Sequence, residues 1–291
     1  MAYQSEAALE QQFIEQLNKQ EYSTVDIPDY DALVENFKVQ FEAFNAPKLD
    51  TPITDKEWER IFNLMLGKSV FQSAKILRDK FVLEREDGTK VYLSFFDQDH
   101  TKNIFQVTHQ TTVVGKYVNR YDVTILVNGF PLVHVELKRR GVAIREAFNQ
   151  INRYQRDSFW AGSGLYEYAQ IFIISNGTHT KYYSNTTRFK HIHEMEGRPA
   201  AGRSQKSSDS FEFTSWWADG RNHVIADLTG FARTFLARHT LLNILTRYCV
   251  FTAEHDLLVM RPYQIAATER ILNRILISEY DPKRLGTPEA G

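Results

Sequence analysis

Apolar positions along the chain first repeat at helical spacing, then alternate as in strands, and return to helical spacing near the end. Helical repeats predict helices, the more so where a capping residue such as Ser5 or the Thr54-x-x-Glu57 capping box precedes them. These helices are expected over residues 5–17, 29–44, 54–66, 69–79, 143–159, 231–248 and 263–277. Alternating or continuous apolar runs predict strands over residues 81–85, 91–96, 104–114, 171–174 and 181–184, together with a hairpin within residues 120–141.

The segment 120–141 is expected to form this hairpin. Its apolar residues alternate along two runs, and the Asn128-Gly129 pair between them is typical of a tight hairpin turn. On the second strand Glu136 and Lys138 lie two residues apart, so they project from the same face. An acid and a base in such an apolar strand carry a solvation cost that stability alone rarely explains.

The length of the hairpin loop decides whether Asp122 of the first strand joins Glu136. A two-residue loop places Asp122 opposite Val135, on the other face of the sheet. A three-residue loop, with Gly129 in the left-handed conformation of a bulge, places Asp122 beside His134 or Glu136. We therefore predict a loop of odd length.

Asp122, Glu136 and Lys138 together could support metal-dependent hydrolysis. Carboxylate oxygens suit Mg²⁺, which binds through one or two carboxylates and keeps several of its waters. The ion lowers the pKa of a bound water, and Lys138 would orient that water and stabilise the charged transition state. The alternative is an exposed sheet face on which a Lys–Glu pair forms across strands.

Composition limits the class of protein. The net charge of −1 over 291 residues excludes a generally basic nucleic-acid coat, so DNA contacts must come from a local patch. Residues 138–156 contain six cations and one acid, among which Arg139, Arg140 and Arg153 are candidates for contacting DNA. A solvated helix face would show the same charge run. The single cysteine excludes a disulfide framework, and without a long apolar run or signal peptide we expect a cytoplasmic protein that does not enter the membrane.

Other polar residues could join the same site. Gln150 and Tyr154 lie one helical turn apart and could contact DNA, or they could simply be a hydrogen-bonded pair that covers the sheet. Glu10 on the first helix is a further candidate metal ligand, and Glu6 a weaker one, although both could be surface acids. His134 lies on the same face as Glu136 and could support it.

The order of helices, strands, helix and strand is that of an α/β core with a mixed sheet flanked by helices. With the Asp on one core strand and the Glu-x-Lys on the next, it resembles the restriction-endonuclease-like PD-(D/E)xK fold. Together the motifs resemble the N-terminal part of the R subunit of type I restriction–modification enzymes, the type IC group most closely. The motifs that carry this resemblance are Asn119-Arg120-Tyr121-Asp122, Glu136-Leu137-Lys138, Gln150-x-x-x-Tyr154 and Arg261-Pro262-Tyr263-Gln264.

The resemblance implies a Mg²⁺-dependent DNA endonuclease, for which Mn²⁺ is the expected substitute ion. Asp122, Glu136 and Lys138 would be its catalytic residues, and Gln150 and Tyr154 would lie beside them. The resemblance also implies double-stranded DNA as the substrate, cut without sequence specificity of the domain's own. Methyltransferase (M) and specificity (S) subunits would be its partners.

The resemblance also divides the chain. It implies an endonuclease domain at 1–195, a linker at 196–210 and a helical connector at 211–258. Residues 259–291 would begin a superfamily 2 helicase motor, in which Gln264 helps to recognise the adenine of ATP. The chain stops before any Walker motif, so we expect it to be a fragment whose ATP-driven translocase lies further on. The rival hypothesis is a docking module that holds DNA or partner subunits without cutting.

Overall fold

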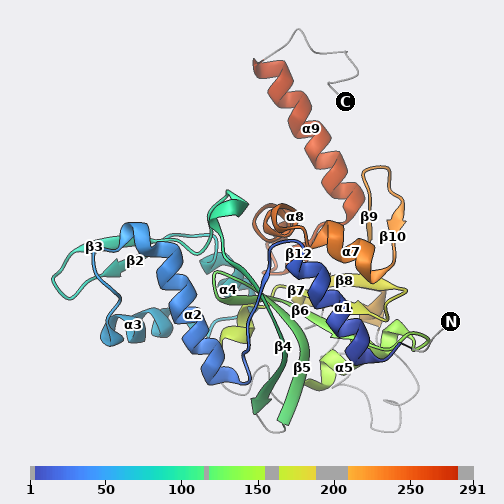
Figure 1. The fold of residues 1–291 in the computed structure, drawn as a ribbon. Coiled ribbons are helices and arrows are strands. Elements are labelled where there is room, and N and C mark those ends of the chain that lie inside the picture. Colours follow the sequence, from blue (N-terminus) through green and yellow to red (C-terminus); the bar gives the residue numbers. More distant parts are fainter. Residues whose placement is uncertain (1–3, 115–117, 155–163, 188–208, 281–291) are drawn as a thin grey trace.

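The computed structural model describes residues 4–114, 118–154, 164–187 and 209–280, and its centre is an eight-stranded mixed sheet (Figure 1). The strand order is β1-β4-β5-β6-β7-β8-β9-β10. The strands are β1 (Ser23–Thr24), β4 (Phe105–Val114), β5 (Val118–Val127), β6 (Phe130–Leu137), β7 (Ile171–Ser175), β8 (Thr180–Ser184), β9 (Ser215–Ala218) and β10 (Val224–Ile225). The pairs β1–β4 and β6–β7 are parallel and the others antiparallel, which confirms the expected mixed α/β sheet.

Helices surround this sheet, and their starts follow the expected caps. The helices are α1 (Glu6–Asn18), α2 (Tyr30–Asn45), α3 (Asp55–Met65), α4 (Val70–Ile76), α5 (Ile144–Tyr154), α7 (Leu228–Phe235), α8 (Arg238–Asn243) and α9 (Pro262–Tyr280). Ser5 caps α1, and Thr54 and Glu57 form the capping box of α3. The part of the expected helix 143–159 beyond residue 154 lies outside the described residues.

Shorter elements complete the chain. They are the 3₁₀ turns η1 (Ala46–Lys48), η2 (His100–Lys102), η4 (Leu165–Tyr168) and η6 (Asp209–Phe213), the π-helical turn η7 (Ile244–Tyr248), and the strands β2 (Phe81–Glu84), β3 (Lys90–Leu93), β11 (Cys249–Phe251) and β12 (Leu257–Val259). The strands β2 and β3 pair with each other, as do β11 and β12. The expected single helix over 231–248 is therefore wrong, because the chain there divides into α7, α8 and η7.

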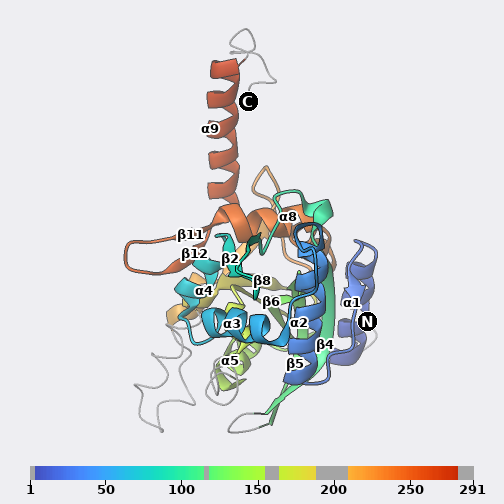
Figure 2. The ribbon, with the colours of Figure 1, turned by 90° about the vertical axis from the view of Figure 1, so that its left-hand side faces the viewer.

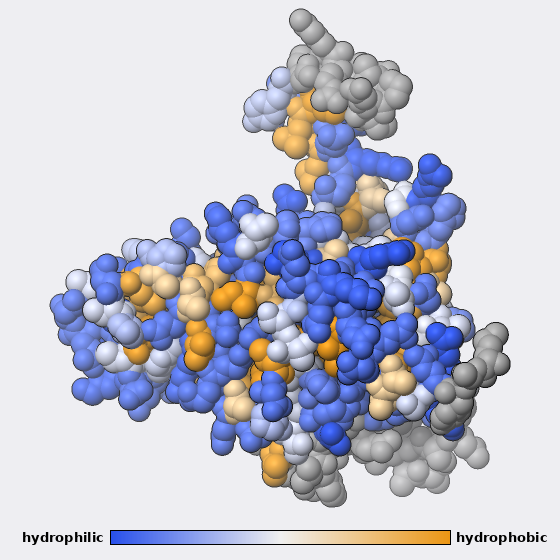
Figure 3. All heavy atoms as spheres, viewed as in Figure 1, coloured by the Kyte–Doolittle hydropathy of each residue, from blue (hydrophilic) through white to orange (hydrophobic). Residues whose placement is uncertain are grey.

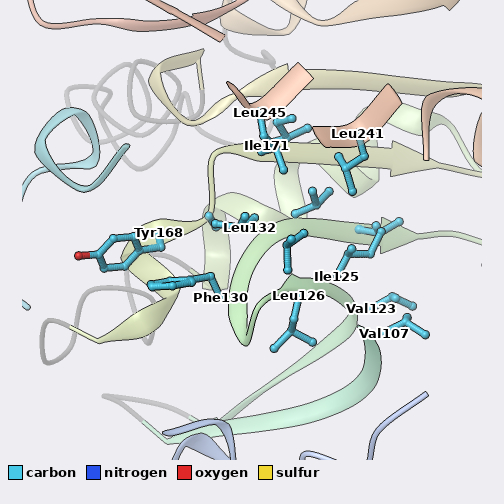
Figure 4. Packing of buried hydrophobic residues seen from close by; sticks show 14 of the residues in the cluster. Val107, Val123, Ile125, Leu126, Phe130, Leu132, Tyr168, Ile171, Leu241 and Leu245 are labelled. Carbon is cyan, nitrogen blue, oxygen red and sulfur yellow. The ribbon is translucent and has the colours of Figure 1, made fainter. Parts of the chain in front are cut away.

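The core lies on both faces of the central strands. Every residue of β6 is buried, as expected for a strand that helices cover on both sides. On one face Ile171 of β7 lies beneath Leu241 and Leu245, from α8 and η7 (Figure 4). On the other face the rings of Phe148 in α5 and Tyr183 in β8 are 5.0 Å apart. Because α5 joins the parallel strands β6 and β7, the sequence between them forms a βαβ crossover.

The β5–β6 hairpin has a two-residue turn, so the prediction of an odd-length loop is wrong. Asn128 and Gly129 both have positive φ, 50° and 84°, and Val127 pairs with Phe130 across them. The register shifts inside the hairpin, because Ile125 pairs with Val133 whereas Leu126 pairs with Pro131. The extra residue on β6 is thus a β-bulge, and it supplies the odd offset that the loop does not.

Gly129 is required by its surroundings as well as by its φ angle. A Cβ atom at this position would lie 2.8 Å from the Cα of Phe37 in α2, which is too close for any side chain. The preceding Asn128 is wholly buried, and its side chain bonds to Ile104 N and Phe95 O. The turn is therefore fixed against α2 and the loop before β4.

The C-terminal third differs from the expected helical connector at 211–258. It contains strands as well as helices, and β9 and β10 extend the main sheet. The linker expected at 196–210 lies mostly outside the described residues. After β12, α9 points away from the rest of the described chain (Figures 1 and 2), and its residues Ile271, Leu272, Ile275 and Leu276 are exposed. Apolar residues are visible along this helix on the molecular surface (Figure 3). In the described ranges no helix has both the length and the apolar character needed to cross a membrane.

Candidate active site

Asp122 and Glu136 meet at the end of the β5–β6 hairpin that is remote from its turn. Beyond the bulge Thr124 pairs with His134 and Val123 with Val135, so the next residues, Asp122 and Glu136, are brought together. Asp122 Oδ2 accepts a hydrogen bond of 2.8 Å from the backbone N–H of Leu137. The two carboxyl groups therefore converge. The odd register offset that this requires was predicted, but it is produced by the β-bulge and not by the loop.

Lys138 completes the group. Its backbone N–H bonds to Ser175 O at 2.8 Å, which continues the β6–β7 pairing just past the strand end. Its Nζ lies 3.0 Å from Glu136 Oε1 and 3.2 Å from the carbonyl oxygen of Leu137. The Lys138 side chain is only 12% exposed, so its ammonium group is largely shielded from solvent. The structure thus brings together all three residues that were predicted to be catalytic.

Glu136 is wholly buried, and only one of its two carboxylate oxygens has a hydrogen-bond partner among the described residues. Within the described parts of the chain its Oε2 has no hydrogen-bond partner. Nε2 of His134 lies 3.7 Å from this oxygen, which is beyond hydrogen-bond distance. His134 is itself buried between the rings of Tyr121 and Phe172, whose centroids are 5.2 and 6.0 Å from its own. The expectation that His134 lies beside Glu136 is therefore confirmed.

Burial and mutual repulsion disfavour the charged forms of the two acids. Burial, and then the neighbouring Glu136, raise the pKa of Asp122 to about 7, while the Leu137 N–H and Lys138 act against them. Burial likewise raises the pKa of Glu136 to about 7, against the opposing charge of Lys138. One ammonium group does not compensate the buried Glu136 carboxylate and the half-buried Asp122 carboxylate together, so a further cation would stabilise this site.

The residues present fit a Mg²⁺ ion. Asp122 and Glu136 supply the one or two carboxylates that Mg²⁺ commonly takes from a protein, and among the described residues Glu136 Oε2 has no hydrogen-bond partner. Across the ranges that the structure describes, no group of three or more His, Cys, Asp or Glu side chains is placed to hold a metal. The site therefore resembles an open Mg²⁺ site, which takes its remaining ligands from water and substrate, more than a closed structural one.

Glu10 lies near this pair but has other partners. It accepts a hydrogen bond from Gln110 and lies 3.0 Å from Nδ1 of His109. Gln110 occupies the position of β4 between the residues paired with Tyr121 and Val123, so it is the strand neighbour of Asp122. A role for Glu10 as a ligand stays a prediction. Sequence gave no signal for the Glu10–Gln110 contact, which depends on the packing of α1 against β4.

The predicted DNA-contacting residues are only partly described. Arg139 is exposed, and its backbone N–H bonds to Glu6 at 3.2 Å. The Arg140 side chain lies beside Gly177, in the turn between β7 and β8. Gln150 is half-buried on α5, whereas the side chains of Arg153 and Tyr154 lie outside the described residues.

Gln264 lies far along the chain from the acids, at the start of α9. Its Oε1 accepts a hydrogen bond of 2.8 Å from the backbone N–H of Arg261. It lines a cavity of about 460 Å³ together with Tyr182, Phe213, Met260, Arg261 and Tyr263. Its predicted role in adenine recognition stays a prediction.

Comparison with known proteins identifies the family. Residues 3–191 match the family described as the type I restriction enzyme R protein N terminus. The chain belongs to this family. The match covers more than half of the chain and includes Asp122, Glu136 and Lys138, so the resemblance seen in the motifs is confirmed.

Named relatives agree with this assignment. Over 94% of its length the chain is 43% identical to the type I restriction enzyme SauMSSORF170P endonuclease subunit of Staphylococcus aureus (strain MSSA476), and it spans 27% of that protein. It is 41% identical, again over 94% of its length, to the EcoprrI endonuclease subunit of Escherichia coli, of which it covers 83%. The chain thus spans about a quarter of its staphylococcal relatives. These names do not specify the type IC group, which stays a prediction.

Proposed function

We propose that this chain is the Mg²⁺-dependent endonuclease part of a type I restriction enzyme R subunit, built on a PD-(D/E)xK core. The observation that carries the proposal is the convergence of the buried Glu136 carboxyl group, the half-buried Asp122 carboxyl group and one ammonium group at the end of β6. In open α/β sheets ligands bind at the carboxyl ends of strands, and this site lies there. The substrate would be a phosphodiester bond of double-stranded DNA.

Each residue has a distinct part in the hydrolysis. Asp122 and Glu136 would hold the Mg²⁺ ion, which lowers the pKa of water and neutralises charge on the phosphoryl oxygens when it is bound. The Leu137 N–H fixes the orientation of Asp122, at 2.8 Å. Lys138, held by Glu136 and a carbonyl oxygen, orients the attacking water and stabilises the negative charge that develops at phosphorus.

The wider role follows from the relatives. In the full-length protein we propose that this domain acts together with an ATP-driven translocase that begins near residue 259, and with methyltransferase and specificity subunits. The proposal is supported by the name endonuclease subunit and by the much greater length of the staphylococcal relatives. The domain itself would then bind DNA through phosphates, without sequence specificity of its own.

Calorimetric titration of Mn²⁺ into the chain tests the metal site. We expect saturable binding that is lost in Asp122→Asn and in Glu136→Gln, while circular dichroism shows both variants folded. Glu167→Gln is the matched control, because Glu167 is another buried carboxyl group but lies on η4. In the assembled enzyme the two site variants should cleave DNA at least about 10³-fold more slowly than wild type.

The titration is repeated with a short duplex present, because the substrate supplies ligands in open Mg²⁺ sites. Mn²⁺ binding that is unaffected by both substitutions, with and without DNA, would contradict the proposal. Cleavage at the wild-type rate by either variant would do the same. Both results would favour the docking module instead.

A further inference from the structure

A cluster of cationic and aromatic side chains lies on the sheet at one side of the candidate site. We call Arg145 of α5, Lys181 of β8, Phe211 of η6 and Trp216 of β9 the cation–aromatic cluster. The guanidinium of Arg145 and the Nζ of Lys181 lie 4.4 and 4.7 Å from the centroid of the Phe211 ring. Lys181 Nζ also lies 5.0 Å from the Trp216 ring. Two cations therefore share one aromatic ring.

The sheet register places this cluster on the same face as the catalytic acids. Glu136 pairs with Ile174, Ile174 with Lys181, and Lys181 with Trp216, so the four residues form one row across β6, β7, β8 and β9. Residues paired across neighbouring strands point to the same face of the sheet. With strands about 4.8 Å apart, Lys181 lies about 10 Å from Glu136 along this row. The cluster and the catalytic acids thus face the same side.

Glu212 is an acid that the described residues place beside these two cations. Among the described residues, Arg145 forms an ion pair with Glu212 at 3.3 Å, and the Glu212 side chain is 77% exposed. Lys181 Nζ instead bonds to the hydroxyl of Thr214, at 3.0 Å. Burial lowers the pKa of Lys181, and the nearby Arg145 lowers it further, although Glu212 opposes them. A bound anion would relieve this repulsion.

The partner that fits is the DNA backbone. Arg and Lys side chains contact phosphates, and such contacts position DNA without reading its sequence. We propose that the cation–aromatic cluster binds a backbone phosphate of the strand that is cut at the Asp122–Glu136 site. Because the row brings Lys181 within about 10 Å of Glu136, the bound phosphate would lie close to the bond that is cut. This position relative to the cut bond rests on the proposed nuclease function, whereas the phosphate contact itself does not.

Fluorescence anisotropy of a short labelled duplex, in EDTA, tests the contact apart from metal binding and cleavage. The variants are Lys181→Met, which keeps an apolar stem against the rings, and Arg145→Gln. Each should weaken binding by the whole chain about five- to tenfold near 100 mM KCl, and lower the salt slope by about one. Lys181→Arg should restore both values, because Arg also carries the charge. Lys19→Gln is the matched control, since Lys19 is an exposed lysine at the end of α1.

Wild-type affinity and salt slope in both variants would overturn the proposal. So would an equal loss in Lys19→Gln, or no detectable duplex binding by the wild-type chain at low salt. If Lys181→Met does not fold, Arg145→Gln decides alone, because the Arg145 side chain is 41% exposed. A failure of the nuclease proposal would appear in Mn²⁺ binding and cleavage, and a failure of this proposal in the salt slope.

Discussion

Two buried glutamates in this chain, Glu57 and Glu136, have opposite surroundings. Glu57 in α3 is 1% exposed and uses both carboxylate oxygens. Its Oε1 lies 2.9 Å from Nε of Arg85, and its Oε2 accepts the N–H of Thr54 at 2.9 Å. Glu136 is equally buried, but Lys138 holds only its Oε1, and a second acid, Asp122, lies beside it.

We interpret the difference as that between a structural carboxylate and a proposed metal ligand. Around Glu57 the buried charge is paired with Arg85 and hydrogen-bonded. Around Glu136 the described residues leave one oxygen without a hydrogen bond, and burial beside a second acid disfavours the charged form. Stability alone does not account for such an arrangement, whereas a site that binds a cation requires it.

The largest expected effect is on stability, and its sign should differ between the two glutamates. Glu57→Gln leaves Arg85 without its counter-charge, so we expect the free energy of unfolding to fall by about 3 kcal/mol. Glu136→Gln removes a buried charge repulsion and should raise it by about 1 kcal/mol at pH 8 without metal. Urea denaturation of both variants measures the difference.

Glu86→Gln is the control for this measurement, because Glu86 is half-exposed and its contact with Lys56 is long, at 3.7 Å. It should change stability by less than about 0.5 kcal/mol. If Glu57→Gln and Glu136→Gln lowered stability equally, the two carboxyl groups would have the same structural role and the contrast would be lost.

The second expected effect is the pH dependence of metal binding. Because the pKa values of Asp122 and Glu136 are raised to about 7, the folded chain binds protons between about pH 4 and 7 that the unfolded chain does not. Without metal, these groups therefore destabilise the fold progressively as pH rises through that window. A metal must displace the same protons, so its affinity should fall below pH 7 by about tenfold per pH unit for each proton released.

Mn²⁺ titrations on either side of pH 7, in two buffers of different ionisation enthalpy, measure both the affinity and the protons released. Glu57→Gln should show the same pH dependence as wild type wherever it is folded. Affinity that does not change between about pH 6 and 8 would show that the two acids are already charged without metal. Glu136 would then differ less from Glu57 than its burial beside a second acid indicates.

The hairpin shows how far sequence alone leads. The Asn128-Gly129 turn and the apolar alternation predict the two strands, and the chemistry of the site requires the odd offset that the structure has. Sequence did not locate the bulge, because apolar alternation fixes the faces of a strand and not its pairing partner. Pro131 was the available signal, since a proline within a central strand is confined to bulges.

Other features depend on contacts between distant parts of the chain. The helix expected over 231–248 is interrupted at Ala237, which has an extended ψ of 131°. Just before this break, Leu236 O accepts a hydrogen bond from the hydroxyl of Tyr22, a contact that no local pattern reveals. The cation–aromatic cluster was missed for the same reason, because its row depends on the order of β6 to β9. Local chemistry indicated the candidate acids Asp122 and Glu136, whereas the residues around them depend on how distant strands and helices pair.

The smallest expected effect is at a third buried glutamate, Glu167 of η4, and it sharpens the comparison. Like Glu136, Glu167 has an Oε2 without a hydrogen-bond partner in the described part of the chain, and burial raises its pKa to about 7. No second acid contributes to this shift, so a buried oxygen without a partner does not by itself make a metal site. Glu167→Gln should raise the free energy of unfolding by about 1 kcal/mol at pH 8 and leave Mn²⁺ binding unchanged.

The pH dependence identifies the cause of this gain. At pH 4 the wild-type carboxyl group is protonated in the folded chain, so the substitution should give little or no stabilisation there. Urea denaturation of wild type and Glu167→Gln at pH 4 and pH 8 measures how much the substitution raises the free energy of unfolding at each pH. An equal gain at pH 4 and pH 8 would mean that packing and not titration is responsible. Weaker Mn²⁺ binding in this variant would mean that burial of a carboxyl group matters more than the pairing of Asp122 with Glu136.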